Sequence, residues 1–303
     1  MNDQINKQSS TQQLSRVRTF LFGALAFVWF AEMVQWGFLA STGGWQNIWK
    51  DIAPQLTTAL LITHSIRAAT KGALGVMAVF GLRSKNPATR TVLFISMSLV
   101  PPLNIIFPCR ADGFPLGTTA VAAIFSVILW TSFFLFKEPV QRSRYSVQLP
   151  PSRGEIVQYV WFAVNATVLT LAALFFLSAP RAALDFIFPG LSGLLHTYET
   201  GLASMTSSNL SSGTHLLSLA IASWIATVYC RSNPALRQAM TVASIVHAGL
   251  ICLFPLRRVI LEIGGSSATT SILVAFAPLL AGWLFYAVFS SKVDPKKLQE
   301  ANI

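Results

Sequence analysis

The stretch RSKNPATR, Arg83–Arg90, returns with one residue fewer as RSNPALR, Arg231–Arg237, and this repetition decides the fold. When Asn86 is placed on Asn233, eight of the 25 positions in 86–110 are identical to their counterparts. Average composition predicts about one or two such identities by chance. The identities begin with an NPAxR motif and end with an FPxR motif in both copies. We therefore interpret the chain as an internal duplication.

The composition is that of a membrane protein. Of the 303 residues, 53% are hydrophobic and only 11% are charged, whereas a soluble domain carries about 25% charged residues. The net charge is +11, but the Lys and Arg residues sit between long apolar runs and form no basic face with interleaved aromatic residues. The charge therefore indicates membrane anchoring, and we expect no nucleic-acid partner.

Eight apolar segments are long enough to cross a bilayer, since most have 17 to 23 residues and a helix rises ~1.5 Å per residue across a ~30 Å core. The segments cover 18–40, 66–83, 91–108, 116–136, 156–178, 214–230, 237–255 and 268–290. The third contains Pro101 and Pro102, which we expect to kink it. The sequence thus predicts an all-α integral membrane protein with eight transmembrane helices.

Basic residues are distributed unequally between the two sides of the predicted membrane arrangement. The N-terminus and the connections after every second segment hold fifteen Lys and Arg residues, whereas the opposite side and the spans hold seven. The positive-inside rule then places both termini in the cytoplasm. Because four spans per unit preserve orientation, the units 1–148 and 149–303 form a parallel repeat about an axis along the membrane normal.

Two pairs of short motifs mark equivalent places in the units. We interpret NPAxR as a cytoplasmic turn that starts a helix, and FPxR as the far end of that helix. Thr63-His64 and Thr214-His215 are expected at the start of each unit's second helix, where Thr is a natural cap. His64 is followed on the same helix face by Arg67 and Lys71, a polar stripe that the second unit lacks.

Motifs of cofactor and metal chemistry are absent from the sequence. Cys109, Cys230 and Cys252 have no metal-binding spacing. There is no Gly-rich phosphate loop, GxSxG, HExxH or repeated DDxxD pattern. We therefore expect no cofactor and no metal, and the chain is not expected to be an ATP-driven pump, a metalloprotease or a prenyl transferase.

Glu32 lies well inside the first span, in AFVWFAEMVQW, where a charged residue costs roughly 2.5–3.5 kcal/mol. It is therefore the leading candidate for a functional residue. A buried carboxyl can be protonated and act as a general acid, whereas pairing with Arg67 or Lys71 would keep it ionised. A purely structural role, in which such a pair fixes the first two helices, is an equal alternative.

Further acids and aromatic residues are expected around an outward-facing cavity. Asp112 and Glu262 are candidate helper or base residues, and the long outer loops 41–65 and 179–213 are candidate lids. The expected substrate-binding residues are Trp29, Trp36, His64, Arg67, Phe107 and Phe254. Packing against lipid is the simpler alternative for every aromatic residue in this set.

Two family resemblances fit these observations. Each half, with a short second helix followed by an R-x-NPA-type turn, resembles the DoxX-like four-helix membrane proteins. The whole chain is similar in layout to the eight-span terpene cyclases of fungal meroterpenoid pathways, through Glu32 in the first helix, further acids on one side, and abundant Trp and Phe. This resemblance implies that a membrane-embedded carboxylic acid protonates an epoxide or alkene and that aromatic faces stabilise the carbocation.

We therefore expect a membrane-embedded cyclase or isomerase that takes a lipophilic isoprenoid or meroterpenoid substrate from the lipid bilayer. Glu32 would be the general acid, and Asp112 or Glu262 the helper or base. The alternative is a non-catalytic membrane protein, either a transporter of small solutes or lipids or an accessory subunit of a membrane complex. Transport is less favoured because Pro101 and Pro102 break a helix in the first half only.

The compartment stays open between the endoplasmic reticulum and a bacterial inner membrane. The first apolar run is too long for a cleavable signal peptide and lacks a small-residue cleavage site. Asn209-Leu210-Ser211 is an N-glycosylation sequon on the expected outer side, which would fit a lumenal position.

Overall fold

The computed structural model describes residues 2–42, 54–107, 116–135, 153–187, 199–229, 233–260, 277–284 and 286–287. Within these ranges every regular element is a helix, which confirms the predicted all-α class. The labelled helices are α1 (Asn2–Thr42), α2 (Pro54–Arg83), α3 (Pro87–Ser98), α4 (Val100–Ile106), α5 (Leu116–Leu135), α6 (Arg153–Ser178), α7 (Pro180–Ile187), α9 (Glu199–Tyr229) and α10 (Pro234–Ile260). A further helical stretch covers 277–284 and 286–287.

Four helical stretches in the described part of the chain are long and apolar enough to cross a membrane. They are Arg16–Gly37, Pro87–Ile106, Tyr159–Ser178 and Ala235–Leu253. Large apolar side chains are also exposed on the outside of the bundle, for example Phe27 at 75% on α1 and Phe134 at 67% on α5. Such faces are costly in water and suit lipid tails. The structure therefore supports the prediction of a membrane protein.

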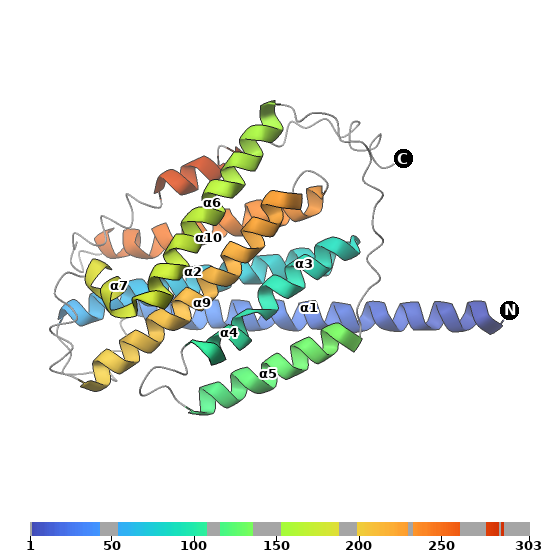
Figure 1. Cartoon of the computed structure of the whole chain (residues 1–303), viewed down its shortest axis with the longest axis horizontal. Coiled ribbons are helices and arrows are strands. Elements are labelled where there is room, and N and C mark those ends of the chain that lie inside the picture. The colour runs from blue at the N-terminus through green and yellow to red at the C-terminus, as the bar shows by residue number, and fades with distance from the viewer. Residues whose placement is uncertain are drawn as a thin grey trace.

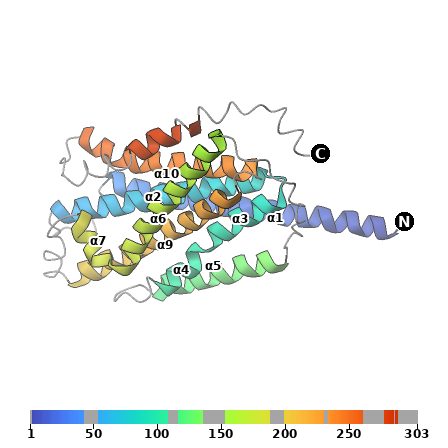
Figure 2. The same cartoon turned by 45° about the horizontal axis from the view of Figure 1, so that its top comes forward.

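The helices form an elongated bundle with α2 near its centre (Figure 1). α2 packs along α1 and α10 and also contacts α9, whereas α9 packs along α6. Figures 1 and 2 both show α5 at one edge, where it packs on α4. Both views also show the N-terminal turns of α1 projecting beyond the other helices. The contacts leave α2 enclosed by protein on several sides.

Small residues let neighbouring helices approach α2 closely. Ala68 and Ala73 are fully buried. An added Cβ at Gly72 would lie 2.8 Å from Leu250 Cδ1 and 2.9 Å from Met33 Sδ, so a side chain there would force the Leu250 side chain of α10 and the Met33 side chain of α1 to move. Small residues at helix interfaces are the usual means of close packing in a bilayer. The polar side chains of α2 can therefore meet protein groups instead of lipid.

Both NPAxR motifs start helices, as the sequence predicted. Asn86 precedes α3, and its side-chain oxygen accepts hydrogen bonds from the backbone N–H groups of Ala88 at 2.9 Å and Thr89 at 3.3 Å. Asn233 precedes α10 and accepts from the Leu236 N–H at 3.0 Å. The same Asn233 oxygen accepts a hydrogen bond from the buried Thr89 hydroxyl at 2.8 Å. The two equivalent turns therefore meet inside the fold.

The predicted third span is interrupted near its prolines at the single residue Leu99, whose backbone stays in the helical region (φ −75°, ψ −27°), and its counterpart is not interrupted. α3 ends at Ser98 and α4 begins at Val100, with Pro101 and Pro102 in the first turn of α4. Proline lacks the N–H that a helix interior uses but is tolerated in a first turn. α10 runs without interruption through the equivalent positions, Ala248 and Gly249. The predicted kink is confirmed, and the two halves differ here.

Two expectations about the outer connections are wrong. The 41–65 stretch contains the start of α2 at Pro54, and the 179–213 stretch contains α7 and the start of α9 at Glu199. His64 and His215 consequently lie inside helices, so neither preceding Thr is a cap at a helix start. Hydropathy missed these helical turns because they are rich in Ser and Thr, whose hydroxyls can bond to the helix backbone.

The sequon at Asn209 is not an accessible glycosylation site in this fold. Asn209 lies within α9 and is fully buried. Its Nδ2 group donates a hydrogen bond to the Pro180 carbonyl at 3.1 Å. Because glycans are bulky and require an exposed asparagine, the sequon gives no support for a lumenal position.

Replacing Asn233 by alanine should destabilise the protein more than replacing Asn86. Each change removes a helix cap worth about 1 kcal/mol. Asn233→Ala additionally takes the acceptor from the buried Thr89 hydroxyl, which adds roughly 1–3 kcal/mol. Unfolding of both purified variants in the same detergent measures the difference, and Asn86→Ala is the matched control. Equal losses of stability would contradict the buried link between the turns.

Candidate functional site

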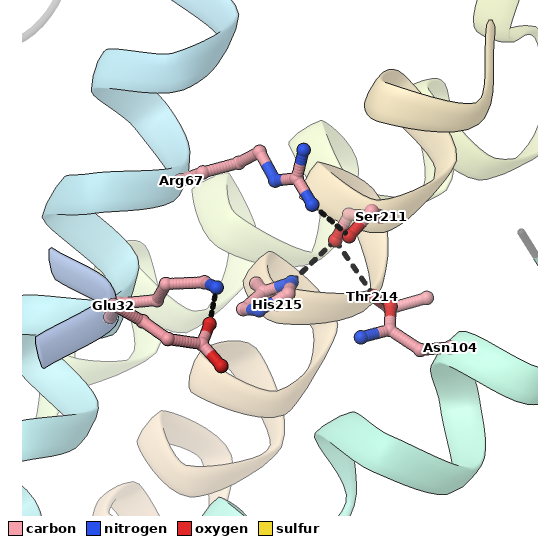
Figure 3. A network of polar contacts seen from close by, with 7 residues as sticks. Glu32, Arg67, Asn104, Ser211, Thr214 and His215 are labelled. Atoms are coloured by element: carbon pink, nitrogen blue, oxygen red, sulfur yellow. Dashed lines mark hydrogen bonds and ion pairs between the residues drawn. The ribbon is translucent and has the colours of Figure 1, made fainter. Parts of the chain in front are cut away.

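An ion pair joins α1 to α2. Glu32 of α1 contacts Lys71 of α2 through Glu32 Oε2 and Lys71 Nζ (Figure 3). The side chain of Lys71 is 4% exposed and that of Glu32 is 38% exposed. The cation is therefore enclosed, and the carboxylate reaches it from the surface of α1. Of the two states of Glu32 that the sequence left open, the structure shows the paired one.

Trp36, one turn after Glu32, lies beside both cations of α2. The guanidinium carbon of Arg67 lies 4.0 Å from the centre of the indole ring, and Lys71 Nζ lies 5.4 Å from it. Both distances are in the range of cation–π attraction. The imidazole ring of His64 lies 4.6 Å from the same indole, measured between centroids. The Trp36 side chain of α1 thus lies against the three residues that form the polar face of α2, His64, Arg67 and Lys71.

α9 contributes a second polar stripe to this region, so the expectation that the second unit lacks one is wrong. Ser211, Thr214, His215 and Ser218 recur at helical spacing, and each is 5% exposed or less. Arg67 Nη2 donates a hydrogen bond to Ser211 Oγ at 2.9 Å. His215 Nδ1 lies 2.6 Å from the Ser211 carbonyl oxygen. Since a carbonyl oxygen only accepts, Nδ1 carries the hydrogen in this bond.

Asn104 extends the network to α4. The Thr214 hydroxyl oxygen lies 2.5 Å from Asn104 Oδ1 and 2.7 Å from the Ser211 carbonyl oxygen. Figure 3 shows Arg67, Ser211 and Asn104 converging from three different helices, with Glu32 at the other end of the cluster. Because α4 is set off from α3 by the break after Ser98, that break helps to position Asn104.

Two buried polar groups beside His215 have no hydrogen-bond partner among the described residues. Trp29 is 3% exposed, and its ring packs edge-on against His215 with centroids 6.1 Å apart. Its indole N–H is unsatisfied, as is the hydroxyl of Ser218, one turn after His215. Such groups are uncommon in native interiors and call for an explanation, for instance a bound molecule.

The residues described above, from Glu32 and Lys71 to Ser211, His215 and Asn104, form one polar cluster. Five predicted site residues belong to it: Glu32, Trp29, Trp36, His64 and Arg67. Phe107 follows α4 and is half-buried. Phe254 belongs to α10, but its side chain lies outside the described part of the structure, as do Asp112 and Glu262 altogether. Their predicted roles stay predictions.

Other members of the polar cluster are missing from the predicted site: Ser211, Thr214, His215 and Asn104. The first three carry a usable signal, because they recur at one-turn spacing once 199–229 is treated as a single helix. Asn104 carries no such signal, since its role depends on where the broken third helix places α4.

The polar cluster is rich in cations and hydrogen-bond donors. Arg67 and Lys71 supply positive charge, Glu32 supplies a carboxylate, and α9 supplies hydroxyl groups. Within the described residues, no group of three or more His, Cys, Asp or Glu side chains gathers in a way that could hold a metal ion. The arrangement can bind an anionic or hydrogen-bond-accepting group and can exchange a proton with it.

Comparisons of the chain with protein-family models, with curated proteins and with solved structures found no match. The functional argument therefore rests on the residues of the cluster.

Removing either charge of the ion pair should destabilise the protein, and Glu32→Gln should do so more than Lys71→Gln. The first change leaves an enclosed ammonium without its carboxylate, whereas the second leaves a carboxylate that is 38% exposed. Breaking a fully buried pair costs about 3–5 kcal/mol, and exposure of Glu32 lowers this figure. The double variant should recover part of the loss because neither charge remains.

Thermal unfolding in detergent tests this ranking. Lys85→Gln, at an exposed position in the turn before α3, is the matched control for Lys71→Gln. Strictly additive losses in the double variant would contradict an energetic coupling between Glu32 and Lys71.

Proposed function

We propose that the chain is a multi-pass membrane protein with eight spanning helices, built as a parallel duplication with both termini in the cytoplasm. Described helical segments fall within each of the eight apolar stretches. The helix contacts support a duplication, because α1 packs along α2 as α6 packs along α9. Moreover, α2 contacts α10 as α9 contacts α3 and α4. In this pattern the second helix of each unit meets the third helix of the other, as a twofold axis requires.

α2 and α9 are the two polar helices among the proposed spans. They contain 30 and 31 residues, which suffices to cross a ~30 Å core at ~1.5 Å per residue. Their polar stripes are buried against other helices. Polar residues in a membrane are tolerated where they face the interior of a bundle. This burial supports counting both helices as spans.

Lys85 and Arg181, which are both exposed, should lie on opposite sides of the membrane. In a variant with Cys109, Cys230 and Cys252 replaced by serine, a new cysteine at position 85 should react with a membrane-impermeant maleimide only from the cytoplasmic side. A new cysteine at position 181 should react only from the other side. Labelling of both positions from one side would contradict the eight-span arrangement.

We further propose that the protein is a cyclase or isomerase of a lipophilic isoprenoid or meroterpenoid substrate taken from the bilayer. The observation that carries this proposal is the Glu32–Lys71 pair, an ionisable couple with one half-exposed member on α1. Trp29 and Trp36 lie one turn to either side of Glu32. Proton-transfer chemistry and aromatic surfaces are thereby combined at a place that a lipophilic molecule can approach.

The ion pair defines what the mechanism requires. At rest Lys71 holds Glu32 as a carboxylate, so Glu32 must gain a proton before it can act as a general acid. A protonated Glu32 can then protonate an alkene or epoxide. Trp36 already packs against two cations, and an indole face attracts a carbocation in the same way. Loss of a proton completes a reaction that consumes no cofactor, with Asp112 and Glu262 as the predicted bases.

Glu32→Gln should reduce product formation about 100-fold or more, because glutamine cannot donate the proton. Membranes that contain the wild type or the variant are incubated with farnesyl-bearing aromatic substrates, with and without a terminal epoxide. Products are followed by NMR, since cyclisation leaves the mass unchanged. Lys85→Gln is the control that should retain activity.

The two negative outcomes have different meanings. If the wild type converts none of these substrates, the cyclase proposal fails. If a folded Glu32→Gln protein still forms product, the proposal that the protein is a cyclase is retained, and Glu32 is excluded as its general acid.

A transporter of lipids or small solutes is the second candidate, and the break between α3 and α4 favours it. Discontinuous helices commonly form binding sites in transporters, and Asn104 of α4 contacts the cluster through Thr214. The uninterrupted α10 argues against this candidate, because transporter repeats usually break at corresponding positions. Uptake of a substrate into sealed vesicles without conversion would favour transport over catalysis.

A further inference from the structure

Glu32 covers an otherwise enclosed ammonium group. The Lys71 side chain is 4% exposed, and its carboxylate partner is 38% exposed. Beside Glu32 on the surface of α1, Ala31 and Gln35 are exposed as well. A molecule that approaches from the lipid along this surface therefore meets the Glu32 carboxylate before it meets Lys71. A second carboxylate could take the place of the first.

The groups around Lys71 suit the two oxygens of a carboxylate. Arg67 lies one turn away on the same face of α2 and over the same Trp36 ring. Trp29, whose ring packs edge-on against His215, adds a buried indole N–H with no hydrogen-bond partner among the described residues. Figure 3 shows His215 between Arg67 and the Glu32 end of the cluster, and its Nδ1–H already donates to the Ser211 carbonyl. The two cations and the indole N–H are groups that recognise carboxylates.

We propose that this polar cluster binds the carboxyl group of a lipophilic acid and that the bound acid transfers its proton to Glu32. The ligand enters as the neutral acid, because a charged form is costly in hydrocarbon. The O–H bond of the ligand breaks, and an O–H bond forms on Glu32. The electron pair left on the ligand oxygen stays there, and the new carboxylate pairs with Lys71.

The exchange is balanced in charge. One carboxylate and one ammonium are present before it and after it, so no net charge enters the low-dielectric interior. A phosphate head group would bring more charge than the Glu32 carboxylate that it displaces, and a carboxylate is therefore the favoured ligand chemistry.

This inference deepens the proposed function, and it rests on that function only for the steps after binding. It names the head group of the substrate and the source of the proton that the ion-paired Glu32 lacks at rest. Binding of a lipophilic acid does not depend on turnover. The binding proposal and the cyclase proposal can therefore fail separately.

The test measures binding to the full-length protein in lipid nanodiscs. The probes are hexadecanoic acid labelled with carbon-13 at its carboxyl group, hexadecanol as an uncharged ligand of equal chain length, and hexadecyl phosphate. The wild type should bind the acid at least about tenfold more tightly than the alcohol. Lys71→Gln should remove this preference, and Lys85→Gln should keep it. Glu32→Gln, which lacks the competing carboxylate, should bind the ionised acid more tightly than the wild type, although it should form no product in the cyclase assay.

Infrared difference spectra test the proton transfer. Binding to the wild type should produce a labelled carboxylate band together with an unlabelled carbonyl band from protonated Glu32, and the unlabelled band should be missing in Glu32→Gln. A bound acid that keeps its proton in the wild type would overturn the transfer step.

Three binding results would overturn the site itself. They are equal binding of the acid and the alcohol by the wild type, weaker binding of the acid by a folded Glu32→Gln protein, and binding of hexadecyl phosphate without binding of hexadecanoic acid. If either single variant does not fold, the double variant Glu32→Gln/Lys71→Gln serves in its place, because it leaves neither member of the ion pair without its partner. It should bind the acid and the alcohol equally, and a retained preference for the acid would overturn the site.

Discussion

An ammonium group in the interior of a helical bundle must be enclosed by protein and paired, and Lys71 imposes this requirement on the centre of this bundle. α2 meets it with small residues that admit α1 and α10 at short distance, as at Gly72. Glu32 then reaches Lys71 from α1, and Trp36 packs beside it. The close packing and the ion pair depend on each other, because a wider spacing would separate the charges and let lipid between the helices.

The two NPAxR turns are alike, whereas the polar stripes of α2 and α9 differ. Asn86 and Asn233 both cap a helix, and Thr89 joins the two turns through a buried hydrogen bond. Each stripe has one histidine, but α2 carries the cations Arg67 and Lys71, whereas α9 carries Ser and Thr hydroxyl groups. Where α2 and α9 meet, these stripes complement each other, and Arg67 donates to Ser211. The polar cluster thus belongs to the junction of the halves rather than to either one.

Glu32 and Lys71 differ in exposure, and this difference bears on both the structural and the proposed functional role of their ion pair. Burying both members of an ion pair carries a desolvation cost for each charge, and in this pair only Lys71 is buried, whereas Glu32 remains 38% exposed. The carboxylate can therefore be displaced while the ammonium stays in place. The same feature explains how a resting carboxylate could become an acid, since a displaced Glu32 no longer has a cation to keep it ionised.

Elementary patterns in the sequence determined the helical class, the helix starts at both NPAxR turns and the interruption near Pro101. They also identified Glu32 as a charge that is energetically costly inside an apolar segment, with Arg67 and Lys71 as possible partners. These features depend on composition and on residues close together in the chain. Only the tertiary structure decided that Lys71 is the partner, because Arg67 and Lys71 share one face of α2 and the placement of α1 selects between them. It also decided the roles of Ser211, His215 and Asn104, which meet across helices that local sequence does not place against each other. The early starts of α2 and α9 escaped prediction because hydropathy marks a span by its apolar residues, and these first turns are rich in Ser and Thr.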